Sequence, residues 1–375
     1  MIGKIGRGCL LLVMVLFLSG EMVWGEERRE GGRSYRPELP EESYEYADIE
    51  LPLHLSILYN NIPEDNPITN EGATLGRVLF YDRRLSANNQ VACASCHLQA
   101  QGFSDPAALS TGFAGGHTRR NSMGLSNNRY FQPNHFFWDT RADSLEELVL
   151  LPIEDRIEMG SELERVIVEL EMTGFYDLLF MEAFGTAEIT EERIAKALAQ
   201  FVRSIVSYQS KYDEGVGVGF ENFTPLEAYG LQLFESHELR CNICHTTDTH
   251  VLFGARNNGL DMVYEDNGLG EITGHPTDMG RFKPPSLRNV AVTGPYMHDG
   301  RFETLEETLT HYQNGIKEHP SLDEFLPVGG FNFDEGEKNA LLAYLGTLTD
   351  EALLEDPKYS DPFPAGWTVL LPVVR

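Results

Sequence analysis

The chain is poor in cysteine and in strand-like patterns. Only 5 of its 375 residues are cysteine. One of them, Cys9, lies in an apolar run near the N-terminus, and the other four form two Cys-x-x-Cys pairs, which leaves none for a separate disulfide. Because alternation of polar and apolar residues is scarce, the sequence predicts a mainly α-helical protein with long loops and little β-structure.

Basic residues are also few. Lys and Arg number 29 against 58 Asp and Glu, and the formal net charge is −29. This balance argues against nucleic acid as a partner. The simpler interpretation is a solvated acidic surface, and the alternative is a charged field that docks a basic or neutral partner protein.

Residues 1–25 have the pattern of a secretory signal peptide. Lys4 and Arg7 precede the apolar run Cys9–Leu18, and Val23–Gly25 offer a cleavage site. The run is too short to cross a bilayer, so we expect an exported, periplasmic protein without a transmembrane anchor after cleavage. Cleavage would remove two basic residues and one acidic residue, changing the net charge from −29 to −30.

The motif Cys-x-x-Cys-His occurs twice, and it is the sequence at which haem c is attached. The two thiols bond the vinyl groups of a haem and the histidine ligates its iron, so the chain is predicted to carry two covalently bound haems. The alternative, one zinc ion held by both cysteine pairs, leaves both histidines unexplained. The predicted haem-binding residues are Cys93, Cys96 and His97 in the first copy and Cys241, Cys244 and His245 in the second.

The chain also suggests two diverged copies of one unit. Gly76–Phe80 precedes the first motif, and the similar Gly230–Phe234 precedes the second. After the signal peptide, residues 26–50 are charged and read as a flexible leader. We therefore expect an N-terminal haem domain over residues 51–211, a C-terminal haem domain over 212–350 and a tail over 351–375.

Helix starts are marked by capping residues. Hydroxyl or carboxylate side chains stand before helix-forming segments, in most cases with Glu three residues later. In the helix that begins after Thr190, four apolar residues share one face. The capping residues are Ser144, Thr190, Thr224, Thr304 and Asp334, and the apolar stripe is Ile194, Leu198, Phe201 and Ile205.

Several further motifs follow one another from about Leu53 to Thr349. They are Leu79–Asp82, Phe136–Asp139 with Arg141 and Ala142, Ile157–Met159, Pro285–Asn289 and Pro295–Phe302. Together with the two haem motifs they resemble the bacterial dihaem cytochrome c peroxidases and the related methylamine-utilisation maturase MauG. The resemblance implies two cytochrome c-like haem domains packed against each other.

In that family the N-terminal haem reacts with peroxide, which implies that His97 is its proximal ligand. A distal glutamate moves a proton between the peroxide oxygens, and Glu158, 20 residues after Trp138, stands where the family places it. Trp138 would lie between the haems and relay electrons. The simpler alternatives are an exposed loop glutamate and a core tryptophan. Leu148 replaces the glutamine that the family usually has, which makes the handling of peroxide less certain.

The resemblance also points to the sixth ligand of the second haem. Fourteen residues after His298, the peroxidases have Met and MauG has Tyr, and this chain has Tyr312. Independently, Leu305, Leu309 and Tyr312 share one face of a predicted helix, whereas His311 lies off that face. A phenolate ligand favours the higher oxidation states of iron, so both irons are expected to store oxidising equivalents, as in MauG. An ordinary buried tyrosine is the alternative.

Other family features fall on loops. Asn121, Thr293 and Pro295 match a calcium site between the haems, and oxygen-only ligation suits Ca²⁺, although two ordinary loops would look alike. His117 reads as a loop histidine rather than a ligand of the first haem. Basic residues after position 280, among them Lys283 and Arg288, offer partners for haem propionates.

These observations predict a dihaem oxidoreductase of the peroxidase and MauG type. Hydrogen peroxide would react at the first haem, and oxidising equivalents would pass through Trp138 and the second haem to an external donor. That donor is either a small cytochrome or a Tyr or Trp side chain of a partner protein, and Tyr312 favours the second. The alternative is a dihaem electron carrier without peroxidase activity, which Leu148 permits.

Overall fold

The computed structural model describes residues 36–131, 136–251 and 254–369. The predicted signal peptide lies outside these residues, and so does the apolar end of the chain after residue 369. All the described residues belong to one compact unit. Among them, no helix is both long enough and apolar enough to cross a bilayer.

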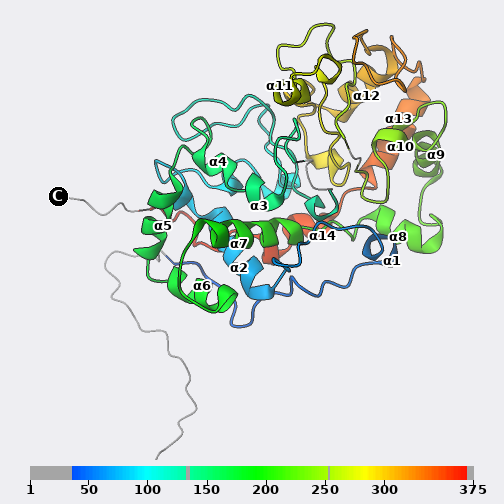
Figure 1. Ribbon diagram of the computed structural model, residues 1–375. Coiled ribbons are helices and arrows are strands. Elements are labelled where there is room, and N and C mark those ends of the chain that lie inside the picture. Colours follow the sequence, from blue (N-terminus) through cyan, green and yellow to red (C-terminus); the bar gives the residue numbers. More distant parts are fainter. Residues whose placement is uncertain (1–35, 132–135, 252–253, 370–375) are drawn as a thin grey trace, which may run out of the picture. The chain divides into compact units, whose positions relative to one another are not determined.

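Regular structure in the described part of the chain is helical (Figure 1). Extended backbone pairs there only in isolated bridges, such as Phe136 with Ala142 and Tyr296 with Phe302. The predicted fold class, mainly α with little β, is confirmed. The α-helices are α1 (Leu53–Ser56), α2 (Asn70–Tyr81), α3 (Leu145–Leu148), α4 (Leu151–Glu154), α5 (Leu163–Glu171), α6 (Tyr176–Phe184), α7 (Glu191–Ser204), α8 (Lys211–Val218), α9 (Pro225–Phe234), α10 (Cys241–Cys244), α11 (Leu269–Thr273), α12 (Leu305–Asn314), α13 (Glu335–Gly346) and α14 (Glu351–Glu355). The 3₁₀ helices are η1 (Arg83–Leu85), η2 (Cys93–Ser95), η3 (Gln99–Gln101), η4 (Asn128–Tyr130), η5 (Pro276–Asp278), η6 (Val290–Val292) and η7 (Pro357–Tyr359).

The predicted caps open their helices. Thr304 and Thr224 accept hydrogen bonds from the backbone N–H groups of Glu307 and Glu227, whose carboxylates bond back to the capping residue. The side chains of Ser144, Thr190 and Asp334 cap α3, α7 and α13 in the same position. Each such cap typically contributes about 1 kcal/mol, which explains why these helix starts are readable from sequence.

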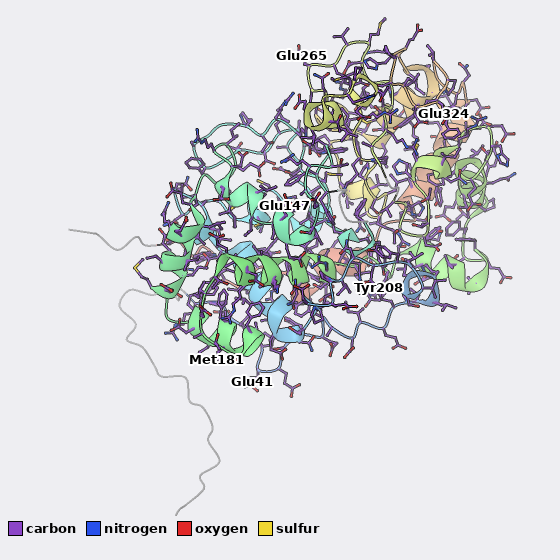
Figure 2. All side chains as sticks on the ribbon, viewed as in Figure 1. Glu41, Glu147, Met181, Tyr208, Glu265 and Glu324 are labelled. Carbon is purple, nitrogen blue, oxygen red and sulfur yellow. The ribbon has the colours of Figure 1, made fainter. Side chains whose placement is uncertain are left out.

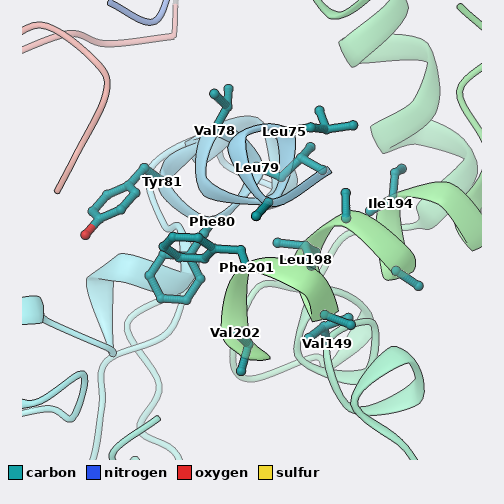
Figure 3. Close-up of a cluster of buried hydrophobic side chains, with 14 of the residues drawn as sticks. Leu75, Val78, Leu79, Phe80, Tyr81, Val149, Ile194, Leu198, Phe201 and Val202 are labelled. Atoms are coloured by element: carbon teal, nitrogen blue, oxygen red, sulfur yellow. The ribbon is translucent and has the colours of Figure 1, made fainter. Parts of the chain in front are cut away.

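A first hydrophobic core lies between α2 and α7 (Figure 3). The predicted apolar stripe of α7 is fully buried there. It packs against the apolar side chains of α2. The central residues are Leu75, Val78, Leu79 and Phe80 on α2 and Ile194, Leu198, Phe201 and Val202 on α7.

A second core forms where α9 packs on α13. Its buried members include Leu231 and Phe234 of α9 and Leu341, Tyr344 and Leu345 of α13. Leu309 and the partly buried Tyr312 of α12 join this core.

The two cores repeat one packing device. Gly76 of α2 lies against the backbone of Ala197 in α7, and Gly230 of α9 lies in the same way against Ala340 in α13. A Cβ atom at either glycine would clash with the carbonyl oxygen of the facing alanine. In both cases the glycine-bearing helix leads into a Cys-x-x-Cys-His motif, so the loose sequence repeat corresponds to a repeated helix–helix contact.

We therefore expect Gly76→Ala to destabilise the protein by about 1–3 kcal/mol, the usual cost of overpacking a core. In an exposed helix the same change would be stabilising, because Ala has the higher helix propensity. Gly217 of α8, where a Cβ would meet nothing within 4 Å, provides the control variant Gly217→Ala. Denaturant unfolding that found both variants equally stable would contradict the close contact.

Both ends of the described chain pack on the first core. Tyr46 is fully buried, and its hydroxyl donates to the carbonyl of Lys358. This corrects the expectation of a flexible leader through residue 50, since its described part contains a core residue. Trp367 is also buried, stacked on Phe363, so the tail packs on the body of the protein up to that point.

Acidic side chains lie on the surface. Glu41, Glu147, Glu265 and Glu324, labelled in Figure 2, are all exposed. They come from widely separated segments, as expected if the negative charge of the chain is spread over a solvated surface.

Candidate functional site

The first Cys-x-x-Cys-His motif lines a cavity of about 420 Å³. η2 places Cys93 in its wall, followed by Cys96 and His97. The Nδ1 atom of His97 lies 2.8 Å from the carbonyl oxygen of Phe103, so Nδ1 donates this bond and Nε2 is the nitrogen available to a metal. Burial lowers the pKa of His97, which keeps the imidazole neutral, as a metal ligand must be.

The second motif lines a separate cavity of about 200 Å³. α10 carries Cys241 and Cys244, and the Nδ1 atom of His245 lies 3.2 Å from the carbonyl oxygen of Pro285. Burial lowers the pKa of His245 to about 4. Both histidines are therefore oriented by a backbone carbonyl and held neutral, although the carbonyls come from unrelated positions in the chain.

The four cysteines of the two motifs form no disulfide with one another, and each pair lies in its own cavity. Burial raises the pKa of Cys93 and of Cys241 to about 12. Within the described ranges, no group of three or more His, Cys, Asp or Glu side chains is arranged so that it could hold a metal ion. The arrangement thus gives no support to a single zinc ion shared by the two pairs.

Trp138 and Lys283 line both cavities. The indole N–H of Trp138 donates to the carbonyl oxygen of Asn121 at 2.8 Å, and the carbonyl of Trp138 accepts from the backbone N–H of Lys283 at 2.7 Å. These bonds fix a wall shared by the two cavities. The sequence predicted this place for Trp138 but not for Lys283.

Glu158 lies in the wall of the first cavity, together with His97. Its loop is held by Asp155, whose Oδ1 accepts the backbone N–H groups of Ile157 at 2.8 Å and Glu158 at 3.1 Å. Burial, together with the negative charge of Asp155, raises the pKa of Glu158, while Arg141 opposes the shift. Glu158 is therefore a cavity carboxylate and not a fully exposed loop residue.

Tyr312 lies in the wall of the second cavity, on the same face of α12 as Leu305 and Leu309. Its hydroxyl is 3.5 Å from Nδ2 of Asn258, and burial raises its pKa to about 12. His311 does not line this cavity, and its Nε2 lies 3.0 Å from the carbonyl oxygen of Asn258. The helical pattern thus predicted correctly which of the two neighbours faces the cavity.

The family model for di-haem cytochrome c peroxidase matches residues 70–217. The methylamine utilization protein MauG of Methylorubrum extorquens is 36% identical, over 77% of this chain and 81% of its own length. MauG of Methylophilus methylotrophus is 32% identical, over 78% of this chain and 86% of its own length. The chain belongs to the dihaem cytochrome c peroxidase and MauG family. A solved structure, that of a MauG-like protein associated with microbial copper homeostasis, has 33% identity and a TM-score of 0.77, and the match covers 84% of this chain and 99% of that one.

Membership of this dihaem family implies two c-type haems, and the two cavities fit them. In each, two cysteines and a neutral histidine, whose Nδ1 bonds to a backbone carbonyl, line the cavity. The family also makes the chain a dihaem oxidoreductase of the cytochrome c peroxidase type, with hydrogen peroxide as the implied substrate.

Leu148, at the position where the family usually has glutamine, lies in the wall of the first cavity at the end of α3. Polar catalytic groups in this wall are therefore fewer than the family pattern implies. In the second cavity Met297 is a neighbour of Tyr312, with its sulfur 3.4 Å from Nδ2 of Asn258.

The segments predicted to hold calcium meet in the structure. The backbone N–H of Asn121 donates to the carbonyl of His298 at 2.8 Å, and His298 follows Pro295 by three residues in the chain. The side-chain Nδ2 of Asn121 points to the carbonyl oxygens of Ala107 and Ala108. Binding of Ca²⁺ by these residues stays a prediction.

Two basic residues contribute to the first cavity in ways that sequence reasoning missed. Lys283 is buried, with its ammonium group 3.6 Å from the ring centroid of Phe131, and burial lowers its pKa to about 7. Arg120 also lines this cavity and pairs with Asp139 at 2.5 Å and Asp266 at 2.7 Å. The sequence offered only weak signs of these positions: Lys283 precedes two prolines, and Arg120 belongs to an Arg-Arg pair.

Arg288 requires a correction. It was offered as a propionate partner, but it lines neither haem cavity. Its guanidinium is instead buried against the carboxylate of Asp213 at 2.6 Å.

Proposed function

We propose that this protein is a periplasmic enzyme that reduces hydrogen peroxide in the first cavity and takes the electrons from an external donor by way of Trp138 and the second cavity. The observation that carries the proposal is the shared wall, in which one indole borders both cavities. A bound haem supplies an iron that exchanges single electrons, and at the first site also a position at which peroxide binds. The chain supplies proton transfer, the electron path and the shape of each site.

Glu158 is the proton-transfer group. Heterolysis of peroxide requires a proton to leave the inner oxygen and reach the outer one, and a carboxylate in the cavity wall performs both steps. Its raised pKa is closer to neutral pH than that of an ordinary carboxyl, so Glu158 can both accept and release a proton during the reaction. Leu148 leaves this task to Glu158 without a neighbouring glutamine amide.

Trp138 is the electron relay. Its N–H is bonded to the carbonyl of Asn121, and a carbonyl does not take up a proton. The indole therefore loses and regains an electron with its proton in place, which keeps the relay fast and reversible.

We propose that Tyr312, which lines the same cavity as His245, would be a second protein ligand of the haem iron there. A phenolate donates charge to iron and stabilises its oxidised forms. The second site could then store an oxidising equivalent received from the first, which oxidation of a Tyr or Trp side chain of a partner protein requires and oxidation of a small cytochrome does not. We also propose that Asn121, Thr293 and Pro295 hold Ca²⁺ next to the shared wall.

Stopped-flow mixing of the holoprotein with hydrogen peroxide tests the proposal. A rapid change in the haem absorption spectrum, complete after one equivalent of peroxide, is expected. The alternative of an electron carrier without peroxidase activity predicts only slow bleaching. The electron-carrier alternative would replace our proposal if neither the diferric nor the reduced protein showed a fast phase.

Tyr312→Phe tests the ligand. We expect a changed ferric absorption and electron paramagnetic resonance (EPR) signal at the second haem, because the oxygen donor is lost while the ring is kept. Tyr264→Phe is the control, since Tyr264 bonds to Asn257 and does not line the cavity. Unchanged spectra for Tyr312→Phe would exclude the phenolate, and a change in Met297→Leu instead would assign the ligand to the neighbouring thioether.

A further inference from the structure

A row of neighbouring aromatic rings extends from the second cavity toward the surface. Phe234 lines the cavity, and its ring centroid is 5.1 Å from that of Tyr344 on α13. The ring of Tyr344 is in turn 6.2 Å from that of Tyr212 on α8. Both tyrosines are buried, and Tyr212 hydrogen-bonds to the partly exposed Asp248. Tyr344 and Tyr212, which lie far apart in the sequence, are thus neighbours behind the cavity.

Each of these tyrosines has a proton acceptor at its hydroxyl. The Tyr344 oxygen lies 2.8 Å from Nε2 of His250, and the Tyr212 hydroxyl donates to Oδ1 of Asp248 at 2.9 Å. Two other buried tyrosines, Tyr46 and Tyr359, donate to backbone carbonyls, which do not take up a proton, whereas the buried Tyr176, in the first core, donates to the carboxylate of Asp82. Pairing with a base therefore distinguishes the tyrosines that line up behind the second cavity from Tyr46 and Tyr359.

We propose that Tyr344 and Tyr212 carry single electrons between an external donor and the second haem site, with His250 and Asp248 as the acceptors of their phenolic protons. The inference rests on the proposed function and extends it by naming where donor electrons enter. Neither residue is needed to bind peroxide or to hold a haem. They relay electrons between the donor and the second haem site.

The electrons and protons balance over one cycle. Tyr344 gives one electron to the oxidised second site and its proton to Nε2 of His250, in the tautomer that leaves Nε2 unprotonated. Tyr212 then reduces the Tyr344 radical and gives its own proton to Asp248, while His250 returns its proton to Tyr344. An electron from the donor restores Tyr212, and Asp248 returns the proton. Two such cycles supply the two electrons that turn one hydrogen peroxide into two waters, and two protons come from solvent.

The charges around Tyr344 and Tyr212 favour oxidation of each phenol together with the loss of its proton. Burial raises the pKa of Tyr344 well above its ordinary value, so the phenol does not ionise before it is oxidised. The guanidinium of Arg288 lies 5.1 Å from the ring centroid of Tyr212, and this positive charge disfavours a protonated ring cation.

The test is freeze-quench EPR of the holoprotein after it is mixed with hydrogen peroxide without a donor, in protein made with ring-deuterated tyrosine. A radical whose hyperfine splitting narrows on deuteration is expected in the wild type. Tyr344→Phe should lower its yield by about tenfold or more, and His250→Gln should slow its formation by a similar factor, since both remove the proton transfer. Tyr46→Phe, a buried tyrosine bonded to a carbonyl, is the matched control.

The outcomes separate this inference from the proposed function. If the wild type shows no fast optical change with peroxide, the proposed function fails. If that change is fast but the radical is not on tyrosine, or persists undiminished in Tyr344→Phe with native thermal unfolding and haem spectra, the tyrosine path is wrong. A loss of the radical in Tyr46→Phe equal to that in Tyr344→Phe would also overturn it.

Discussion

Replacing Glu158 with Gln is expected to slow the reaction with hydrogen peroxide by about 10²–10⁴-fold, the contribution that a positioned acid–base group usually makes. Gln keeps the size and polarity of the side chain in the cavity wall, but it cannot take a proton from the inner peroxide oxygen. The second-order rate constant from stopped-flow absorbance measures the effect. We expect folding and haem attachment to be unaffected, because the replacement is isosteric and lies in the cavity wall.

The pH dependence gives a second signature. Glu158 accepts a proton only as the carboxylate, and burial and Asp155 raise its pKa above the ordinary 4.5. The rate constant of the wild type should therefore fall as the pH drops through this raised pKa, in a range above 4.5. In Glu158→Gln this acidic limb should be absent.

Two neighbouring carboxylates provide controls. Glu154→Gln removes an exposed charge on α4 and should leave the rate unchanged. Asp155→Asn keeps the acceptor for the N–H groups of Ile157 and Glu158 but removes a charge that raises the pKa of Glu158. It should move the acidic limb to lower pH and preserve the plateau. A Glu158→Gln variant with the rate and pH profile of the wild type would exclude Glu158 as the proton carrier.

The features that were predicted from sequence depend on neighbours within a few residues. Caps such as Thr304 with Glu307 act within one helical turn, and the face of α12 that carries Tyr312 follows from helical periodicity. The haem motifs are contiguous pentapeptides. Such signals survive in any tertiary context, which is why fold class and haem attachment could be read directly.

Features set by distant contacts could not be predicted. The burial of Tyr46 depends on a carbonyl 312 residues further along the chain. The partners of Arg288 and the position of Lys283 between two cavities depend on how separate segments pack, and a basic residue in a loop gives no sign of either. Without these contacts, the sequence predicted a flexible leader over residues 26–50 and a pairing of Arg288 with a haem propionate.

Removing the guanidinium of Arg288 should have the largest effect on stability. Arg288 and Asp213 are 0% and 3% exposed, and their charged atoms are 2.6 Å apart. Arg288→Met leaves the Asp213 carboxylate buried with only neutral donors and His54, and loss of one partner of a buried pair typically costs about 3–5 kcal/mol. That is a large share of the stability of an ordinary domain, so the midpoint of denaturant unfolding should fall steeply.

The same pair supports the second cavity. Arg288 follows Pro285, whose carbonyl orients His245, and the guanidinium also donates to the backbone carbonyl of Asp248. Arg288→Met should therefore disturb the spectrum of the second haem before global unfolding. The double variant Arg288→Met with Asp213→Leu removes both charges and should recover most of the lost stability. Equal instability of the single and double variants would show that packing, and not the buried charge, is responsible.

The effect of pH on this variant has a definite sign. Burial alone would raise the pKa of Asp213, but Arg288 outweighs burial and lowers it below the ordinary 3.8. In the wild type the pair therefore stabilises the fold above about pH 4 and is lost as the pH falls through the lowered pKa. In Arg288→Met burial is no longer opposed by the guanidinium, so Asp213 takes up a proton on folding in mild acid. The stability difference between the two proteins should consequently shrink as the pH is lowered from 7 toward 5, and a difference that grows with acidification would contradict the assignment.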